Sequence, residues 1–489
     1  MIGGRAAHGE PMHKKSLLLA TGVACALCSL SANAENLLDV YQDAVKSDPV
    51  IREADARRLA ALEAKPQARG LLFPQANVDG QYTKSDSDGS VTFVQDVLDT
   101  TTPDPTDTIT VVRNTAQAQD ADGWQYRAQV TQTLFRWDQW QQLRRADAQV
   151  ALAEANYRAS EQDLVVRVSQ AYFDVLAAED TLGAAEATLQ AVNRQLEQAE
   201  KRFEVGLIAI TDVQEARAAH DSATAAVIAA KRTLASTKEV VRELTGEAYQ
   251  TLSKPADEIP LDQPQPADEE GWVTQALDQN LQVIAARLGV DVAKRNVSIA
   301  RSGYMPTIDL FANRTQFDFD ATQTNNGLEG PADSDQTEDT IGVQVVIPLF
   351  TGGVTHSRVK EQVYLHRAER ERLEGAVRKA ERDTRDAYLG VIAERARVTA
   401  LQQSVKSNQT ALEATEAGFE VGTRTTVDVL DARRRLFEAQ RDFARSRYDY
   451  LVNIIRLKSA AGVLAPGDLE SINGLLTQAA PIPESKTTP

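Results

Sequence analysis

A sixteen-residue motif occurs twice in this chain, and the two copies lie 216 positions apart. Residues 202–217 read RFEVGLIAITDVQEAR, and residues 418–433 read GFEVGTRTTVDVLDAR. From Phe203 and Phe419 onward, eight of fifteen aligned positions are identical. A spacing of this size is far longer than one unit of a short-repeat solenoid. The chain is therefore a duplicated half-protein, and we expect its two halves to share one architecture.

The N-terminus predicts export. A basic start at Met12-His-Lys-Lys leads into an apolar run over 17–30, and Ala32-Asn33-Ala34 matches a signal-peptidase site. Residues 1–34 are therefore predicted to be a signal peptide that is cleaved after Ala34. Both cysteines of the chain lie within it, and neither fits a lipoprotein signal. We expect a mature protein without a disulfide bond or a lipid anchor.

The composition narrows the functional classes. The 489 residues carry a net charge of −17 at pH 7, which argues against nucleic acid as a partner. After the signal peptide, no stretch approaches the roughly 20 apolar residues of a membrane-spanning helix. An exported chain of this kind is periplasmic, secreted or an outer-membrane barrel protein.

Two proline-free segments, 138–203 and 354–419, predict two very long helices. Each is followed by a short turn and by a second predicted helix, at 212–244 and 428–461. A single helix over 138–203 would be about 100 Å long. Helices of this length indicate coiled-coil or helical-repeat packing.

Segments upstream of the long helices alternate apolar and polar residues, as strands do. They are 76–82, 124–134, 308–317 and 341–350. About ten alternating residues match a tilted membrane strand, although a soluble sheet with one wet face would explain any one of them. Four strands cannot close a barrel in lipid, where open edges are forbidden, but three copies supply twelve. We predict an α+β membrane protein.

The rest of the chain connects these elements. Loops are predicted at 83–123 and 318–340, and the first holds eight aspartates, which fits a cell-surface loop or a disordered acidic insert. The expected organisation is a first repeat, a proline-rich crossover, a second repeat and a largely irregular C-terminal tail. The first repeat spans 35–247, with strands near 74–136, and the crossover spans 248–268. The second repeat spans 269–462, with strands near 306–350, and the tail spans 463–489.

No pattern of catalytic or metal-binding residues is present. Outside the leader there are three histidines, His220, His356 and His366, and none has a partner at metal-site spacing. Gly352-Gly353 lacks the lysine and hydroxyl residue of a phosphate loop. We predict that the chain is not an enzyme and uses no cofactor, so that energy for transport comes from partners.

Several phrases resemble the TolC family of trimeric outer-membrane efflux and secretion channels. They are the predicted mature start Glu35-Asn-Leu-Leu-Asp-Val-Tyr-Gln, the paired motifs, the strand entries at 68–74 and 300–306, and residues 427–432. The resemblance runs from Glu35 to about Leu469. It implies a homotrimer in the outer membrane of a Gram-negative bacterium. A 12-stranded antiparallel β-barrel would be continued by a 12-helix α-barrel with coiled-coil tips in the periplasm.

By the same resemblance the protein is an exit duct. It would passively conduct drugs, small molecules or proteins in tripartite efflux pumps or type I secretion systems. Its partners would be a periplasmic adaptor (membrane fusion) protein and an inner-membrane transporter of the RND or ABC type. Outer-membrane lipid would surround the barrel, and no nucleic acid is expected.

The resemblance also assigns roles at the helix tips. Arg424 would bond Thr211 and Asp212 and so hold the pore shut, while Phe419 replaces a tyrosine whose hydroxyl often bonds the same aspartate in the family. An acidic constriction ring would contain Asp428 and Asp431, with Glu215 as a further candidate, and mutual repulsion would raise some of their pKa values. The turns that would contact the adaptor contain Gly206, Leu207, Gly422 and Thr423.

Each tip motif also has a purely structural interpretation. Gly206 and Gly422 fit left-handed helix C-termini. Thr211 with Gln214, and Thr425 with Asp428, resemble capping boxes. Acidic residues in a first helical turn are favourable with the helix dipole, and a turn can be exposed without any partner.

Three other classes of protein stay open at this point. One is a lipid-anchored efflux duct of the same fold. Another is a trimeric coiled-coil surface protein, which would need one continuous stalk of heptads. The third is a periplasmic adaptor, which carries a single helical hairpin beside small β modules. The duplicated strand pairs and the fold-back at Gly206 and Gly422 favour the duct.

Overall fold

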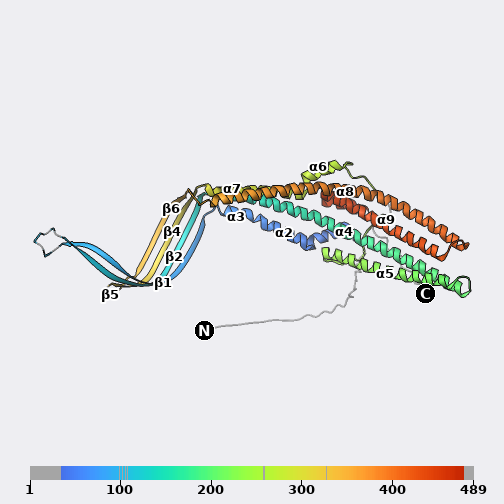
Figure 1. The fold of residues 1–489 in the computed structure, drawn as a ribbon, viewed down its shortest axis with the longest axis horizontal. Coiled ribbons are helices and arrows are strands. Elements are labelled where there is room, and N and C mark those ends of the chain that lie inside the picture. Colours follow the sequence, from blue (N-terminus) through green and yellow to red (C-terminus); the bar gives the residue numbers. More distant parts are fainter. Residues whose placement is uncertain are drawn as a thin grey trace, which may run out of the picture.

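The computed structural model describes residues 35–477, except residues 99, 102, 105, 107, 257–258 and 326–327. The predicted signal peptide with its two cysteines, and residues 478–489, lie outside this part. The molecule is elongated, with a β-sheet towards one end and long helices towards the other (Figure 1). Among the described residues, none of the helices combines the length and the apolar composition that crossing a bilayer requires.

Two long helical hairpins make up the helical end. Hairpin 1 consists of α4 (Trp137–Glu204) and α5 (Ile210–Thr245), and hairpin 2 consists of α8 (Val354–Glu420) and α9 (Thr426–Ala460). The four predicted helices are confirmed to within two residues at each end. Both hairpins turn at the same end of the molecule (Figure 1), so the two copies of the repeated motif become neighbouring tips.

Short helices precede each strand pair and repeat the same capping pattern. They are α1 (Leu37–Ser47), α2 (Pro49–Leu62), α3 (Ala64–Gly70), α6 (Glu269–Gln279), α7 (Leu281–Arg301) and the 3-10 turn η1 (Ser302–Tyr304). Asn36 caps α1 and Asp268 caps α6, while Asp48 caps α2 and Asn280 caps α7. Each pair is separated by 232 positions. The duplication therefore extends to the turns between these helices.

The strands form one antiparallel sheet in the order β1-β2-β4-β6. Their bounds are β1 Gln75–Leu98, β2 Thr108–Phe135, β4 Thr307–Asn325, β5 Leu328–Pro331 and β6 Ser334–Val346. The short strand β5 and then β6 pair with successive parts of β4. β5 and β6 therefore act as one interrupted strand beside β4. Within the described chain, the outer edges of β1 and β6 have no partner strand. Large apolar side chains such as Val78 and Ile341, each 78% exposed, stand on this sheet.

The predicted loops at 83–123 and 318–340 are wrong over much of their length. β1 and β2 stay paired as far as Leu98 and Thr108, and β4 continues to Asn325. Polar groups pair across these extensions: the Thr110 hydroxyl donates to Asp96 at 2.6 Å, and the Tyr82 hydroxyl donates to Asp122 at 2.8 Å. Residues 84–90 and 114–122 contain no large apolar side chain, so the apolar periodicity that predicts half-buried strands did not detect these extensions.

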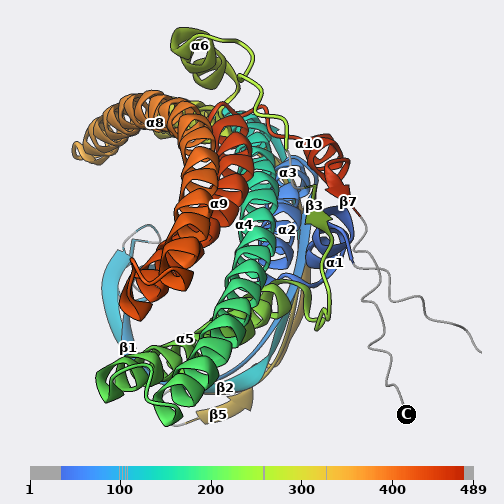
Figure 2. The ribbon, with the colours of Figure 1, turned by 90° about the vertical axis from the view of Figure 1, so that its right-hand side faces the viewer.

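The C-terminal tail also differs from its prediction. Residues 466–473, expected to be irregular, form α10 (Pro466–Asn473), and β7 (Leu476–Thr477) pairs with β3 (Lys254–Pro255) of the crossover. Pro466 suits a first helical position, and Leu469 and Ile472 are buried. The helix forms because it covers the core. Viewed along the long axis, α1, α10, β3 and β7 lie on one side of the long helices (Figure 2).

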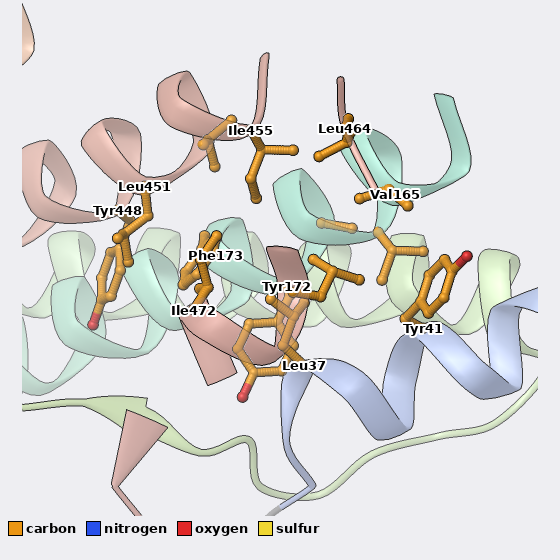
Figure 3. Packing of buried hydrophobic residues seen from close by; sticks show 14 of the residues in the cluster. Leu37, Tyr41, Val165, Tyr172, Phe173, Tyr448, Leu451, Ile455, Leu464 and Ile472 are labelled. Atoms are coloured by element: carbon orange, nitrogen blue, oxygen red, sulfur yellow. The ribbon is translucent and has the colours of Figure 1, made fainter. Parts of the chain in front are cut away.

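The main core lies midway along the helices, beneath the crossover. Tyr172 and Phe173 of α4 pack with Leu37, Tyr448 and Ile472 (Figure 3). Three tyrosine hydroxyls then fasten the crossover to the long helices by donating to its carbonyl oxygens. The bonds are Tyr172 to Ser253 at 2.7 Å, Tyr450 to Asp262 at 2.8 Å and Tyr388 to Ala267 at 2.6 Å.

Candidate gate at the hairpin tips

Each hairpin turns through a glycine with a left-handed backbone. Gly206 has φ +77° and Gly422 has φ +78°. The Leu207 amide donates to the Arg202 carbonyl at 2.8 Å, and the Thr423 amide donates to the Gly418 carbonyl at 2.8 Å. These bonds close the C-terminal turns of α4 and α8, as the glycines predicted. Leu207 and Thr423 are both exposed.

The capping box is confirmed in hairpin 2 and wrong in hairpin 1. The Thr425 hydroxyl oxygen accepts from the Asp428 amide at 3.3 Å, and Asp428 Oδ2 accepts from the Thr425 amide at 2.9 Å. The N-cap of α5 is instead Ala209, which has no side-chain acceptor, and Thr211 lies inside the helix. At the 216-residue spacing, Thr425 corresponds to Ala209 and not to Thr211.

Asp428 and Asp431, the two residues predicted to form the acidic ring, each make hydrogen bonds or ion pairs within hairpin 2. Hydrogen bonds from the Thr425 amide and hydroxyl lower the pKa of Asp428, and the nearby positive charges of Arg424 and Arg435 lower it further. This direction is opposite to the rise expected from mutual repulsion in a ring. Asp431 Oδ1 accepts from Arg434 at 3.2 Å. Within one chain, each carboxylate is therefore held by a neighbour on its own hairpin.

The predicted gate links are not formed within a single chain. Across the described part of the structure, Arg424 makes no hydrogen bond or ion pair with Thr211 or Asp212. Arg424 and Thr211 are exposed, Asp212 is half-buried in the first turn of α5, and Glu215 is exposed one turn later. The stem of Arg424 lies against Gly418, where a Cβ atom would come within 2.8 Å of its Cγ.

Sequence analysis missed contacts that do form at the tips. Arg217 pairs with Glu200 at 3.0 Å, and Arg433 pairs with Glu416 at 2.5 Å, so each hairpin ties its two helices together. Both the arginines and the glutamates are 216 positions apart, so extending the repeat upstream would have revealed them. The Arg202 guanidinium also lies over the ring of Phe419, which no repeat comparison predicts.

Helix α9 has a side-chain cap at its N-terminus and α5 has none, and this difference between the two tips can be tested. Thr425→Ala is expected to raise hydrogen exchange of the first-turn amides of α9 about fivefold, since a lost hydroxyl cap costs about 1 kcal/mol. Ala209→Thr, which places a hydroxyl three residues before Asp212, is expected to slow exchange at the start of α5. Mass spectrometry of the detergent-purified protein would measure both.

The cap of α9 should also depend on pH. Because the folded pKa of Asp428 lies below its ordinary value of about 3.9, the box contributes fully above that value and is lost as the pH falls through the folded pKa. Protection that is equal at pH 7 and pH 3, or unchanged in Thr425→Ala, would contradict this account.

Comparison with known proteins places this architecture in a family of outer-membrane transport channels. The family model "Outer membrane efflux protein" matches residues 40–247 and 272–463, and the chain belongs to this family. It is therefore an outer-membrane duct of a Gram-negative bacterium, of the kind that serves efflux and type I secretion. The resemblance to the TolC family is confirmed.

Individual relatives agree over nearly the whole chain. Outer membrane protein TolC of Vibrio cholerae serotype O1 is 35% identical over 460 residues, which cover 94% of this chain and 98% of that protein. The alkaline protease secretion protein AprF of Pseudomonas aeruginosa is 27% identical over 449 residues, covering 90% and 87%. The crystal structure of the outer membrane protein VceC from Vibrio cholerae has the same fold, with a TM-score of 0.65, 21% identity and coverage of 87% and 96%.

Proposed function

We propose that three copies of this chain assemble into one continuous duct. The observation that carries the proposal is the sheet, whose two outer edges are unpaired in the described chain while apolar side chains stand exposed on it. Open strand edges are not tolerated in lipid. Pairing β6 of one copy with β1 of the next would close twelve strands into a barrel, and the same symmetry would gather twelve helices below it.

The duct is proposed to conduct passively and to take its energy from partners. A periplasmic adaptor (membrane fusion) protein and an inner-membrane transporter of the RND or ABC type would complete a tripartite complex. The family description supports efflux, and we propose drugs or other small molecules as its cargo. The name of AprF, a protease secretion protein, supports proteins as a second kind of cargo.

Assembly and conduction can be tested on the purified chain. The mass of the detergent-solubilised protein, measured by light scattering, is expected to be that of a trimer. In planar bilayers that protein is expected to give discrete single-channel currents. A monomer, or a trimer that conducts no ions, would contradict the proposal. Deletion of the gene should increase sensitivity to drugs or reduce protein secretion, which would identify the cargo class.

The hairpin tips are proposed to form the periplasmic gate of this trimer. Arg424 is exposed on hairpin 2 and carries no ion pair in the described chain, so it is available to Thr211 and Asp212 when subunits meet. Threefold symmetry would gather Asp428 and Asp431 into a ring of six carboxylates, with Glu215 close to the same entrance. Such a ring would favour cations.

The two turns are proposed to be the contact sites for the adaptor. Gly206 and Gly422 turn the chain, and the residues that follow them, Leu207 (73% exposed) and Thr423, are both exposed. Single cysteines at Leu207 or Thr423 are expected to crosslink to the adaptor in cells, whereas a cysteine at Ile341 in the sheet should not. Equal crosslinking from all three positions, or none from the turns, would rule out the assignment.

A further inference from the structure

A cation–π contact joins the two hairpins at their tips. The Arg202 guanidinium, in the last turn of α4, lies over the ring of Phe419, in the last turn of α8. The Cζ atom is 5.1 Å from the ring centroid, within the roughly 6 Å over which a cation is attracted to an aromatic face. Arg202 belongs to hairpin 1 and Phe419 to hairpin 2, so the contact spans the seam between them.

The packing around Phe419 fixes the ring in this position. On hairpin 2, it packs against a buried cluster of apolar side chains, Leu412, Val429, Ala432 and Leu436. Towards hairpin 1, the residues around Arg202 and Phe419 enclose a cavity of only about 10 Å³, which leaves space for one water molecule at most. The ring is therefore held on its own hairpin while the other hairpin supplies the cation.

The duplication shows that this contact is specific to one pair of residues. Phe203, which corresponds to Phe419, is 41% exposed, and the position corresponding to Arg202 is Gly418. The glycine provides the space in which the stem of Arg424 lies. Arg202 thus reaches across to the other hairpin, whereas the stem of Arg424 lies along its own.

The charge of Arg202 is not used in a salt bridge. Among the described residues, no carboxylate lies within ion-pair distance of its guanidinium, whereas Arg217 and Arg433 each pair with a glutamate of the same hairpin. The attraction between Arg202 and the ring is therefore not weakened by a competing carboxylate, and the two hairpins are linked by a contact that needs no hydroxyl on residue 419.

From these contacts we infer that Arg202 and Phe419 form a latch that holds the two hairpins of one subunit together when the duct is closed. The inference rests on the proposed gate and adds to it a closing contact that lies within a single chain. Arg202 is a positioning residue: it touches no cargo and acts by keeping hairpin 1 against hairpin 2. Opening would have to separate the guanidinium from the ring in each of the three subunits.

A double-mutant cycle tests the latch. Arg202→Met keeps an apolar side chain without the charge, and Phe419→Leu keeps the apolar packing without the aromatic face. Each single variant is expected to raise the open probability of the channel in planar bilayers. The rise should be about two- to fivefold per latch, and about 10- to 100-fold if the three latches open together. The double variant should add little, because one contact is lost in all three proteins.

The repeat supplies matched controls. Lys201→Met removes a charge one residue away, and Phe203→Leu changes the corresponding ring of the other copy; both should leave gating unchanged. Arg202→Lys should retain part of the effect of the wild-type residue. A double variant whose effect is the sum of the two single effects, or an equal effect of Lys201→Met, would overturn the latch.

A second measurement separates the latch from the duct function. In the detergent-purified protein, Arg202→Met and Phe419→Leu should each speed hydrogen exchange at both 199–204 and 416–421, on the two sides of the seam. If the wild type conducts no ions, the proposed duct fails while hydrogen exchange still decides the latch. If the wild type conducts ions but the effects of the two single variants are additive in both measurements, the latch fails and the proposed duct stands.

Discussion

Channels carrying Arg424→Ser or Asp212→Ala are expected to conduct more current than the wild type in planar bilayers. A hydrogen bond that involves a charged group is worth about 1.5–3 kcal/mol, so losing it should shift the balance between closed and open tips by roughly 10- to 100-fold. Because both residues are assigned to one link, the double variant should resemble the single variants. Single-channel recording of purified trimers would measure these effects.

Matched variants separate the proposed link from a general loss of charge. Arg441→Ser removes an arginine of α9, the helix that follows the turn of Arg424. Arg441 pairs with Asp442, so this variant should leave the conductance unchanged. Asp428→Asn with Asp431→Asn retains the shape of both side chains but removes the proposed ring, so block by multivalent cations should disappear. Unchanged conductance in Arg424→Ser, together with unchanged block in the aspartate variant, would refute the gate.

The Asp48→Ala variant is expected to lose about 3 kcal/mol of the free energy of unfolding. Asp48 is 2% exposed, caps α2 through the Ile51 amide at 3.3 Å, and accepts from Arg167 Nη2 at 2.7 Å. Removing one member of a buried ion pair typically costs 3–5 kcal/mol. The lower figure applies here because Arg167 is partly exposed and keeps its bond to Asp163. Urea unfolding in detergent, followed by circular dichroism, would measure the loss.

Two controls divide this loss between the cap and the charge. Asp268→Ala removes an exposed aspartate cap from α6 and should cost only about 1 kcal/mol. Asp48→Asn keeps a capping oxygen, as Asn280 does at the corresponding position of the second half, so it should lose less than Asp48→Ala. If Asp48→Ala and Asp268→Ala were equally destabilising, the pair with Arg167 would contribute nothing.

The parts of the fold that sequence predicted well are those with strong local signals. Long proline-free segments bounded by Gly206 and Gly422 fix the hairpins because helix propensity and turn geometry act over a few residues. The extensions of β1 and β2 were missed because 84–90 and 114–122, which adjoin the predicted strands, contain no large apolar side chain. Helix α10 was missed because Leu469 and Ile472 find their partners only when the tail returns to the core.

At the tips, the sequence predicted the local geometry of the turns better than it predicted the contacts between the two hairpins. The turn glycines and the Thr425 box follow from local geometry, and the structure contains them. The prediction that Thr211 caps α5 was wrong. It was based on residue type alone, whereas the 216-residue register of the repeat places Ala209 at the position of Thr425. The contact between Arg202 and Phe419 depends on how two hairpins lie against each other, which the spacing within either hairpin does not encode.

The two halves of the chain also differ in a way that bears on how such proteins diverge. Corresponding residues are 232 positions apart before the strands and 216 after them, so the first strand pair with its connection is longer by 16 residues. The additional length lies where β1 and β2 pair with each other beyond the end of β4. Insertions and deletions there leave the helix contacts untouched. The outer end of the molecule can therefore differ in length between the two halves without disturbing the helix packing or the hairpin tips.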